Sequence, residues 1–276
     1  MRCTAYVVDF AIPERLSLEL TRRCRKACAF CYNGSGPVPS DEWRPEEVAT
    51  LVQALQAHGL RALSLGGGEP LEYEPLDALF EALRPMRSQG LFVSMTTNGL
   101  LLDGRMAQIS RLAPDKVHVS IHFPKRRAEV ERVIRQVLAL RRIGLVSGVN
   151  LLVRRGELEA ARACREQLWS SGIDNRAIVY LPMRGSDTPL PSELADVAGE
   201  PFQSMTCLTG CARSPRFVSL GADRTLAHCS YTQTRRRLRG LTAEAFAEAL
   251  SGLGLAFCGD QEPQMVAQQK RALPIA

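Results

Sequence analysis

The chain alternates short β-like runs with amphipathic helical stretches from residue 16 to residue 181. This alternation predicts βα units around a parallel sheet, because parallel neighbours need a crossover connection long enough for a helix. Glycines that follow the helical stretches are typical of helix C-termini. The expected strands are 16–20, 62–65, 91–96, 116–121, 146–153 and 177–181, and the expected helices include 45–58, 75–89, 128–143 and 157–171.

The texture changes after residue 181. Pro182, Pro189 and Pro191 with Gly185 predict a linker or an ordered crossing loop, after which the alternation is not expected to resume. Two short apolar runs and one helical stretch follow. We therefore expect an N-terminal extension at 1–15, an α/β barrel at 16–185, and a linker with a small cysteine-rich C-terminal module at 186–276.

Composition limits the cellular setting. No run of about 18 apolar residues is present, and the N-terminus lacks the unbroken apolar stretch of a signal peptide, so we expect a cytoplasmic protein without a membrane partner. Nine cysteines in a reducing compartment favour metal binding or catalysis over disulfides. The net charge of +6 comes from arginines spread along the chain, a distribution that does not indicate a nucleic-acid partner.

Three cysteines, Cys24, Cys28 and Cys31, directly follow the first expected strand. Loops at the C-terminal ends of barrel strands are where such folds place their chemistry. Three thiolates at this spacing can bind three irons of one [4Fe–4S] cluster and leave the fourth iron open. A zinc ion normally needs four ligands, and no fourth ligand stands close by. Lys26 is expected near the anionic cluster, where it favours ionised thiolates.

This spacing, with the aromatic Phe30 just before the last cysteine, resembles the signature of the radical S-adenosylmethionine (radical SAM) superfamily. The resemblance implies a partial (β/α)6 TIM barrel. It also implies a [4Fe–4S] cluster on Cys24, Cys28 and Cys31 whose open iron is chelated by S-adenosylmethionine, with Phe30 beside the adenine. A reductase such as flavodoxin or ferredoxin would supply the electron.

Two later segments extend the resemblance. Gly67, Gly68 and Glu69 follow the second expected strand and resemble the family's GGE motif, which implies contacts with the methionine amino group. Glycines here would let backbone groups approach a ligand closely. Asn98 lies in a Thr-Asn-Gly sequence similar to one found in many members, although an Asn-Gly turn explains it equally well.

The fourth strand ends in Ser120 and, two residues later, His122, where members often carry Ser-x-Asp. The resemblance implies that Ser120 contacts the ribose or the methionine carboxylate. His122 departs from the usual aspartate, so it could face substrate instead. Arg126 or Arg127 could pair with the methionine carboxylate through a guanidinium fork. The remaining expected cofactor contacts are Asn150 and Met183.

A second group of cysteines lies in the C-terminal part. Four thiolates can bind a full [4Fe–4S] cluster or a structural zinc ion, or they can be unligated core residues. The pattern resembles the shortened auxiliary-cluster module called a twitch domain, whereas the fuller SPASM form needs more cysteines. The candidate ligands are Cys207, Cys211, Cys229 and Cys258.

Cys258 is remote from the other three, and His228 could replace it at one iron. If it binds no iron, Cys258 is a candidate hydrogen-atom donor. Cys3 and Cys164 are expected to be ordinary residues, with Cys164 a small core hydrophobe in a helix.

The resemblance implies reductive cleavage of S-adenosylmethionine to a 5′-deoxyadenosyl radical that abstracts hydrogen from a substrate. We favour modification of a ribosomally made peptide, with dehydrogenation of a small alcohol or aminocyclitol, or nucleotide or RNA modification, as alternatives. Only about 15 residues precede the first strand, which leaves no room there for a separate leader-binding domain. Arg235–Arg237 and Arg239 could receive an acidic peptide or a phosphate, or could form a solvated basic face. A non-catalytic iron–sulfur or zinc scaffold is the non-enzyme alternative.

Overall fold

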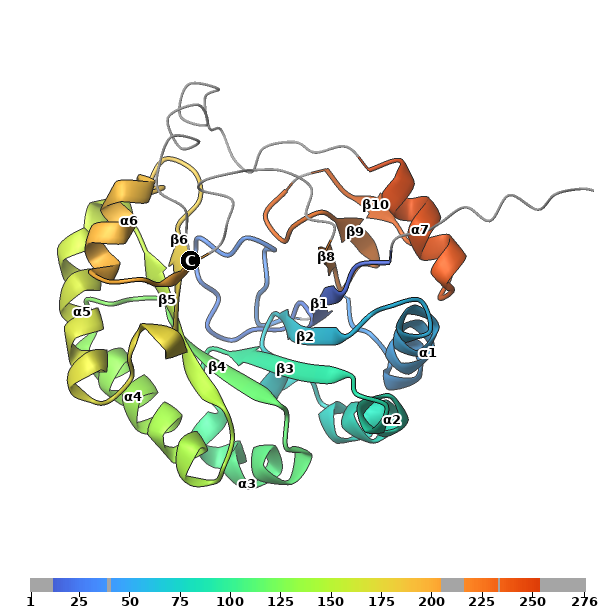
Figure 1. Cartoon of the computed structure of the whole chain (residues 1–276), viewed down its shortest axis with the longest axis horizontal. Coiled ribbons are helices and arrows are strands. Elements are labelled where there is room, and N and C mark those ends of the chain that lie inside the picture. The colour runs from blue at the N-terminus through green and yellow to red at the C-terminus, as the bar shows by residue number, and fades with distance from the viewer. Residues whose placement is uncertain (1–11, 39–40, 205–215, 233, 254–276) are drawn as a thin grey trace, which may run out of the picture.

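A computed structural model describes residues 12–38, 41–204, 216–232 and 234–253. Its centre is a ten-stranded sheet in the order β10-β9-β8-β1-β2-β3-β4-β5-β6-β7, which curves into an open barrel (Figure 1). Strands β1 to β8 pair in parallel wherever they are neighbours, and β9 is antiparallel to both β8 and β10. The strands are β1 (Arg15–Thr21), β2 (Ala62–Gly67), β3 (Phe92–Thr97), β4 (Lys116–Ile121), β5 (Ser147–Val153), β6 (Ile178–Pro182), β7 (Gln203–Ser204), β8 (Phe217–Leu220), β9 (Thr225–Ala227) and β10 (Arg236–Arg237).

Helices cover the outside of the curved sheet, and α7 lies beside β10 (Figure 1). Each of the first five follows a strand and returns the chain to the start of the next strand, as a parallel sheet requires. The helices are α1 (Pro45–Gln56), α2 (Leu76–Ser88), α3 (Leu102–Leu112), α4 (Arg127–Arg142), α5 (Leu158–Ser170), α6 (Pro191–Ala198) and α7 (Ala243–Ser251), and short 3-10 turns are at η1 (Pro70–Glu72), η2 (Arg155–Glu157) and η3 (Asn175–Ala177).

The six strands expected from the sequence are all present, and the α/β partial barrel is confirmed. The expectation that the alternation stops after residue 181 is wrong. Helix α6 follows β6, and the two-residue strand β7 then pairs in parallel with β6. A strand this short carries no periodicity that a sequence pattern could reveal.

The C-terminal hairpin continues the barrel sheet. Strand β8 pairs in parallel with β1, so the β8–β9 hairpin, which is formed by the two short apolar runs, extends the edge beside the first strand. The indole of Trp43 donates a hydrogen bond to the Gly221 carbonyl at 3.1 Å, and the Tyr73 hydroxyl donates to the Trp43 carbonyl at 2.7 Å. These buried contacts tie the hairpin to the barrel.

Side-chain alternation along the strands gives the barrel two chemically different faces. Leu16, Leu18 and Leu20 of β1 are buried in the apolar core. The intervening residues face the other way, and the register places Ser17 beside Ser64, whose hydroxyl lies 2.9 Å from that of Ser94 in the next strand. The barrel interior is therefore polar.

No helix among the described residues is long and apolar enough to cross a membrane. Cys164 is buried in α5, as expected for a small core residue.

Candidate functional site

The loop that carries the three cysteines leaves the C-terminal end of β1 at the open mouth of the barrel. The Cys24 backbone N–H donates to the Gly36 carbonyl at 2.7 Å, and the Cys31 N–H donates to the Cys28 carbonyl at 2.9 Å. Ala27 adopts a left-handed conformation with φ of 42°, which turns the chain between the first two cysteines. The loop is thus folded by its own hydrogen bonds before any ligand is considered.

Cys24, Cys28 and Cys31 are free, partly exposed thiols. Burial raises the pKa values of Cys24 and Cys28, and the Lys26 ammonium opposes the rise at Cys28. Among the described residues, no three ligating side chains converge on one metal ion. A [4Fe–4S] cube binds each thiolate at a different iron, so convergence on one point is not needed. Three thiols on one loop at the barrel mouth fit such a cluster with one iron left for another ligand.

The glycines after β2 are explained first by backbone packing. A Cβ on Gly67 would lie 2.7 Å from the Glu19 Cα, and one on Gly68 would lie 2.2 Å from the Arg23 carbonyl oxygen. Gly67 also has a φ of +103°. The sequence predicted that these glycines let the backbone approach a ligand. In the structure they let the end of β2 pack closely against β1 and the start of the cysteine loop. Gly66 has nothing within 4 Å of such a Cβ.

Glu69 is buried and ties the second loop to the third. Its carboxylate accepts hydrogen bonds from the Thr97 hydroxyl at 2.6 Å, from the Asn98 N–H at 2.7 Å and from the Leu71 N–H at 3.1 Å. Burial raises the pKa of Glu69 to about 7, against the effect of these donors. The Asn98 side-chain amide then donates to the Cys24 sulfur at 3.6 Å. Glu69 thus positions a residue that touches the first cysteine.

A buried cluster that the sequence did not indicate joins the cysteine loop to the end of β4. The Lys26 Nζ lies 2.9 Å from the Glu129 Oε1 and 2.9 Å from the His122 Nδ1, and the His122 backbone N–H donates to the same Glu129 oxygen at 2.7 Å. The Lys26 and Glu129 side chains are only 8% and 9% exposed. An ammonium can only donate, so Nδ1 accepts and the neutral ring carries its proton on Nε2.

Charge in this cluster follows from burial. Burial and the neighbouring Lys26 charge lower the pKa of His122 to about 4, so the imidazole is neutral near pH 7. Burial alone would raise the pKa of Glu129, but its contact with Lys26 brings it below the usual range. The sequence predicted Lys26 near the cysteines, where its charge does oppose the rise in the pKa of Cys28. Its ammonium also pairs with Glu129, 103 residues further along the chain.

Phe30 packs at the same mouth. Its ring lies 5.5 Å from the Phe123 ring and 6.2 Å from the His122 ring, and the Arg154 guanidinium lies 5.6 Å from its centroid. Arg126 stacks on Phe123 at 4.1 Å.

Arg127 lies on the solvent side of α4, 85% exposed and 2.6 Å from the Glu131 carboxylate. Of the two arginines proposed for the methionine carboxylate, only Arg126 is near the mouth.

The other expected cofactor contacts lie along the ends of neighbouring strands. Ser120 is buried and aligned with Asn150 on β5. The side-chain Oδ1 of Asn150 lies 2.8 Å from the His118 Nδ1, so part of the hydrogen-bonding capacity of Asn150 is used inside the protein. The Met183 N–H donates to the Val153 carbonyl at 2.8 Å, directly after β6. These residues lie on neighbouring strands or directly after one, and their role as cofactor contacts stays a prediction.

Of the C-terminal cysteines, only Cys229 lies within the described residues, where it is a partly exposed free thiol. Cys207, Cys211 and Cys258 lie outside them, as does Cys3, so the second metal site stays a prediction. The neighbouring His228 places its Nε2 3.2 Å from the Leu253 carbonyl, and its buried Nδ1 has no hydrogen-bond partner among the described residues.

Comparison with known proteins identifies the class that this fold and loop define. The model of the radical SAM superfamily matches residues 18–173, more than half of the chain. The chain therefore belongs to the radical SAM superfamily and is a radical SAM enzyme. Membership implies a [4Fe–4S] cluster and S-adenosylmethionine, consistent with the cysteine loop.

Particular relatives match parts of the chain. It is 36% identical over 106 residues to a probable GTP 3′,8-cyclase of Methanocella arvoryzae, a match that covers 38% of this chain and 33% of that protein. The alignments to this and similar curated relatives span only about a third of their lengths.

Solved structures share the fold at low identity. Streptococcus suis SuiB bound to its precursor peptide SuiA aligns with a TM-score of 0.70 and 12% identity over 95% of this chain and 67% of that one. The structure of anSMEcpe with S-adenosylmethionine and the Cp18Cys peptide aligns with a TM-score of 0.59 and 15% identity over 82% of this chain and 77% of that one.

Proposed function

We propose that the enzyme cleaves S-adenosylmethionine reductively and uses the resulting 5′-deoxyadenosyl radical to abstract hydrogen from a peptide. The observation that carries the proposal is the folded loop with three free thiols at the barrel mouth. The cluster held there would supply one electron, which breaks the C5′–S bond and yields methionine and the radical. Cys24, Cys28 and Cys31 hold the cluster, and Phe30, Gly67, Gly68, Glu69, Asn98, Ser120, Asn150 and Met183 surround or support the cofactor.

The substrate would lie in the polar interior of the barrel. One buried atom there, the His118 Nε2, has no hydrogen-bond partner among the described residues. His118 is neutral, because burial and the Lys116 charge lower its pKa to about 4, and its Nδ1 faces Asn150. Unpaired buried polar groups are costly, so a substrate with hydrogen-bond donors is favoured over an apolar one. Peptide N–H groups meet this requirement.

The alignment with SuiB bound to a precursor peptide supports a peptide substrate as an analogy of fold. A nucleotide substrate is the second candidate, because the curated matches named GTP 3′,8-cyclase have higher sequence identity than the solved structures, although over a shorter part of the chain. Donor groups of a base or ribose would also suit the barrel interior.

We further propose that Cys229, with Cys207, Cys211 and Cys258, holds an auxiliary [4Fe–4S] cluster in a twitch-like module at 186–276. The Nδ1 of His228, which has no partner in the described part of the chain, is an alternative ligand beside Cys229. About four irons per chain in the wild-type protein, unchanged by Cys207→Ala, would refute the second cluster.

The function is tested with anaerobically reconstituted full-length protein, dithionite and S-adenosylmethionine. The wild-type enzyme is expected to form 5′-deoxyadenosine and the Cys28→Ala variant to form none. Absence of 5′-deoxyadenosine with the iron-loaded wild-type protein would contradict the reaction. If GTP stimulates the formation of 5′-deoxyadenosine, and hydrogen from the GTP ribose is found in the 5′-deoxyadenosine, then the substrate is a nucleotide and not a peptide.

A further inference from the structure

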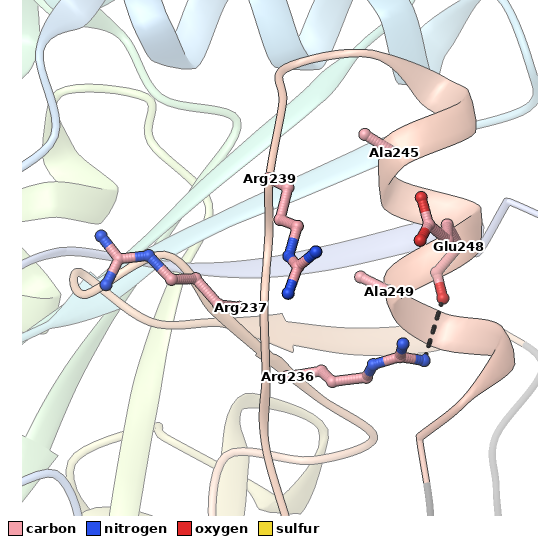
Figure 2. Close-up of a pocket in the computed structure, with 6 residues that line it drawn as sticks. All are labelled: Arg236, Arg237, Arg239, Ala245, Glu248 and Ala249. Atoms are coloured by element: carbon pink, nitrogen blue, oxygen red, sulfur yellow. Dashed lines mark hydrogen bonds between the residues drawn. The ribbon is translucent and has the colours of Figure 1, made fainter.

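A basic pocket lies outside the barrel mouth, between β10 and α7 (Figure 2). We use the term basic pocket for the hollow of about 130 Å³ lined by Arg236, Arg237, Arg239, Ala245, Glu248 and Ala249. The two alanines stand one helical turn apart on α7, and their small side chains leave room beside the arginines. All three arginines are exposed.

The described residues neutralise these arginines poorly. The Arg237 and Arg239 side chains form no hydrogen bond, ion pair or ring contact in the part of the chain that the structure describes, and the Arg236 guanidinium donates there only to the Glu248 carbonyl, at 3.3 Å. The Glu248 carboxylate lines the same hollow without pairing with any of them. Exposure alone does not explain this, since Arg176 is 92% exposed and still pairs with Asp174 at 2.6 Å.

The directions of the side chains indicate the shape of the missing partner. Arg237 points away from α7, whereas Arg236 reaches toward the helix backbone and Arg239 lies between them (Figure 2). One phosphate ion would be held by donors that converge on a point. Guanidinium groups that diverge from a short segment, as those of Arg236, Arg237 and Arg239 do (Figure 2), suit several carboxylates on an extended chain, each paired with its own fork.

We propose that the basic pocket binds an acidic segment of a peptide. This deepens the proposed function, because it rests on a peptide being the substrate and assigns the pocket to a part of it distant from the reacting residue. The hairpin that carries β10 continues the sheet through β9 and β8 to β1, whose end holds the cysteine loop. A peptide anchored at the basic pocket is therefore held on the same rigid sheet as the reaction site.

The test measures binding of fluorescein-labelled hexaglutamate to the full chain by fluorescence anisotropy at low and moderate salt. We expect binding that weakens with salt, and an about fivefold higher Kd for the Arg237→Gln/Arg239→Gln variant, as two exposed ion pairs would give. The matched control is Arg61→Gln/Arg135→Gln, which removes two exposed arginines elsewhere on the surface and the same net charge. The control is expected to bind like the wild type.

Three results would overturn the proposal. The first is that hexaglutamate does not bind. The second is an equal loss of hexaglutamate affinity in both double variants, which would show that binding depends on net charge alone. The third is tighter binding of inorganic phosphate or of a single-stranded oligonucleotide of equal charge. The proposed function is read separately, as 5′-deoxyadenosine formed without peptide. The Arg237→Gln/Arg239→Gln variant should retain that activity, so either proposal can fail without the other.

Discussion

Cations are treated differently in two regions of the same sheet. At the cysteine loop, the Lys26 ammonium is buried against Glu129 and His122. At the basic pocket, Arg237 and Arg239 have no partner among the described residues. A buried charge must be paired within the fold because its desolvation is costly, whereas exposed charges stay solvated and can pair with a ligand. The first arrangement positions a loop, and the second is suited to binding.

The largest loss of stability is expected for Glu129→Gln, which removes the charge that pairs with Lys26. Removing one partner of a buried pair leaves an uncompensated charge, and we expect the free energy of unfolding to fall by about 2–3 kcal/mol. Urea denaturation of the metal-free protein measures it. The matched control is Glu131→Gln on the same helix, whose partner Arg127 is 85% exposed, with an expected loss of less than about 0.5 kcal/mol. Equal losses in the two variants would show that burial does not distinguish the two pairs.

The seating of the β2 loop against the cysteine strand gives the next largest effect. Gly68→Ala places a methyl group against the Arg23 carbonyl, and we expect a loss of about 2 kcal/mol in unfolding free energy. Gly66→Ala meets open space and should change it by less than about 0.5 kcal/mol. Both are measured in urea, and a Gly66 variant as damaged as the Gly68 variant would refute the packing explanation.

Glu69 is a third case, a buried carboxyl group beside the cysteine loop that forms no ion pair among the described residues. Burial raises its pKa from 4.5 to about 7, so the folded state holds this proton more tightly than the unfolded chain. Its contribution to stability is complete below about pH 4.5 and is lost as pH rises to about 7, by about 1–3 kcal/mol. As the pH rises through this range, the unfolding free energy of the wild type should therefore fall relative to that of Glu69→Gln, which lacks the titrating carboxyl group. Parallel pH profiles would contradict the shift.

The smallest effect on stability is expected at the basic pocket. Arg237→Gln/Arg239→Gln removes no contact made within the described residues, so the unfolding free energy should change by less than about 0.5 kcal/mol. Thermal and urea unfolding measure it. A loss above about 1 kcal/mol would mean that these arginines stabilise the fold, and the contrast with Lys26 would disappear.

Local patterns predicted the six barrel strands and the cysteine loop, because strand period, glycine at helix ends and ligand spacing are encoded within short segments. They did not reveal α3, whose sequence contains Gly104 and a weak apolar stripe, or the two-residue β7. The Lys26–Glu129 contact joins residues 103 positions apart and has no local signature. The sequence predicted Gly67 and Gly68 as cofactor contacts, whereas their packing against Glu19 and Arg23 depends on a register that only the folded sheet supplies.

If Cys24, Cys28 and Cys31 leave one iron open, S-adenosylmethionine binds directly to the cluster and must change its electronic structure. The most direct measurement is the electron paramagnetic resonance spectrum of the dithionite-reduced protein with and without S-adenosylmethionine, compared with Cys28→Ala. The signal of this cluster is the one that is present in the wild type and lost in Cys28→Ala. We expect its g values to change when S-adenosylmethionine is added to the wild type. A signal that depends on Cys28 but is unaltered by S-adenosylmethionine would contradict the binding of S-adenosylmethionine to an open iron.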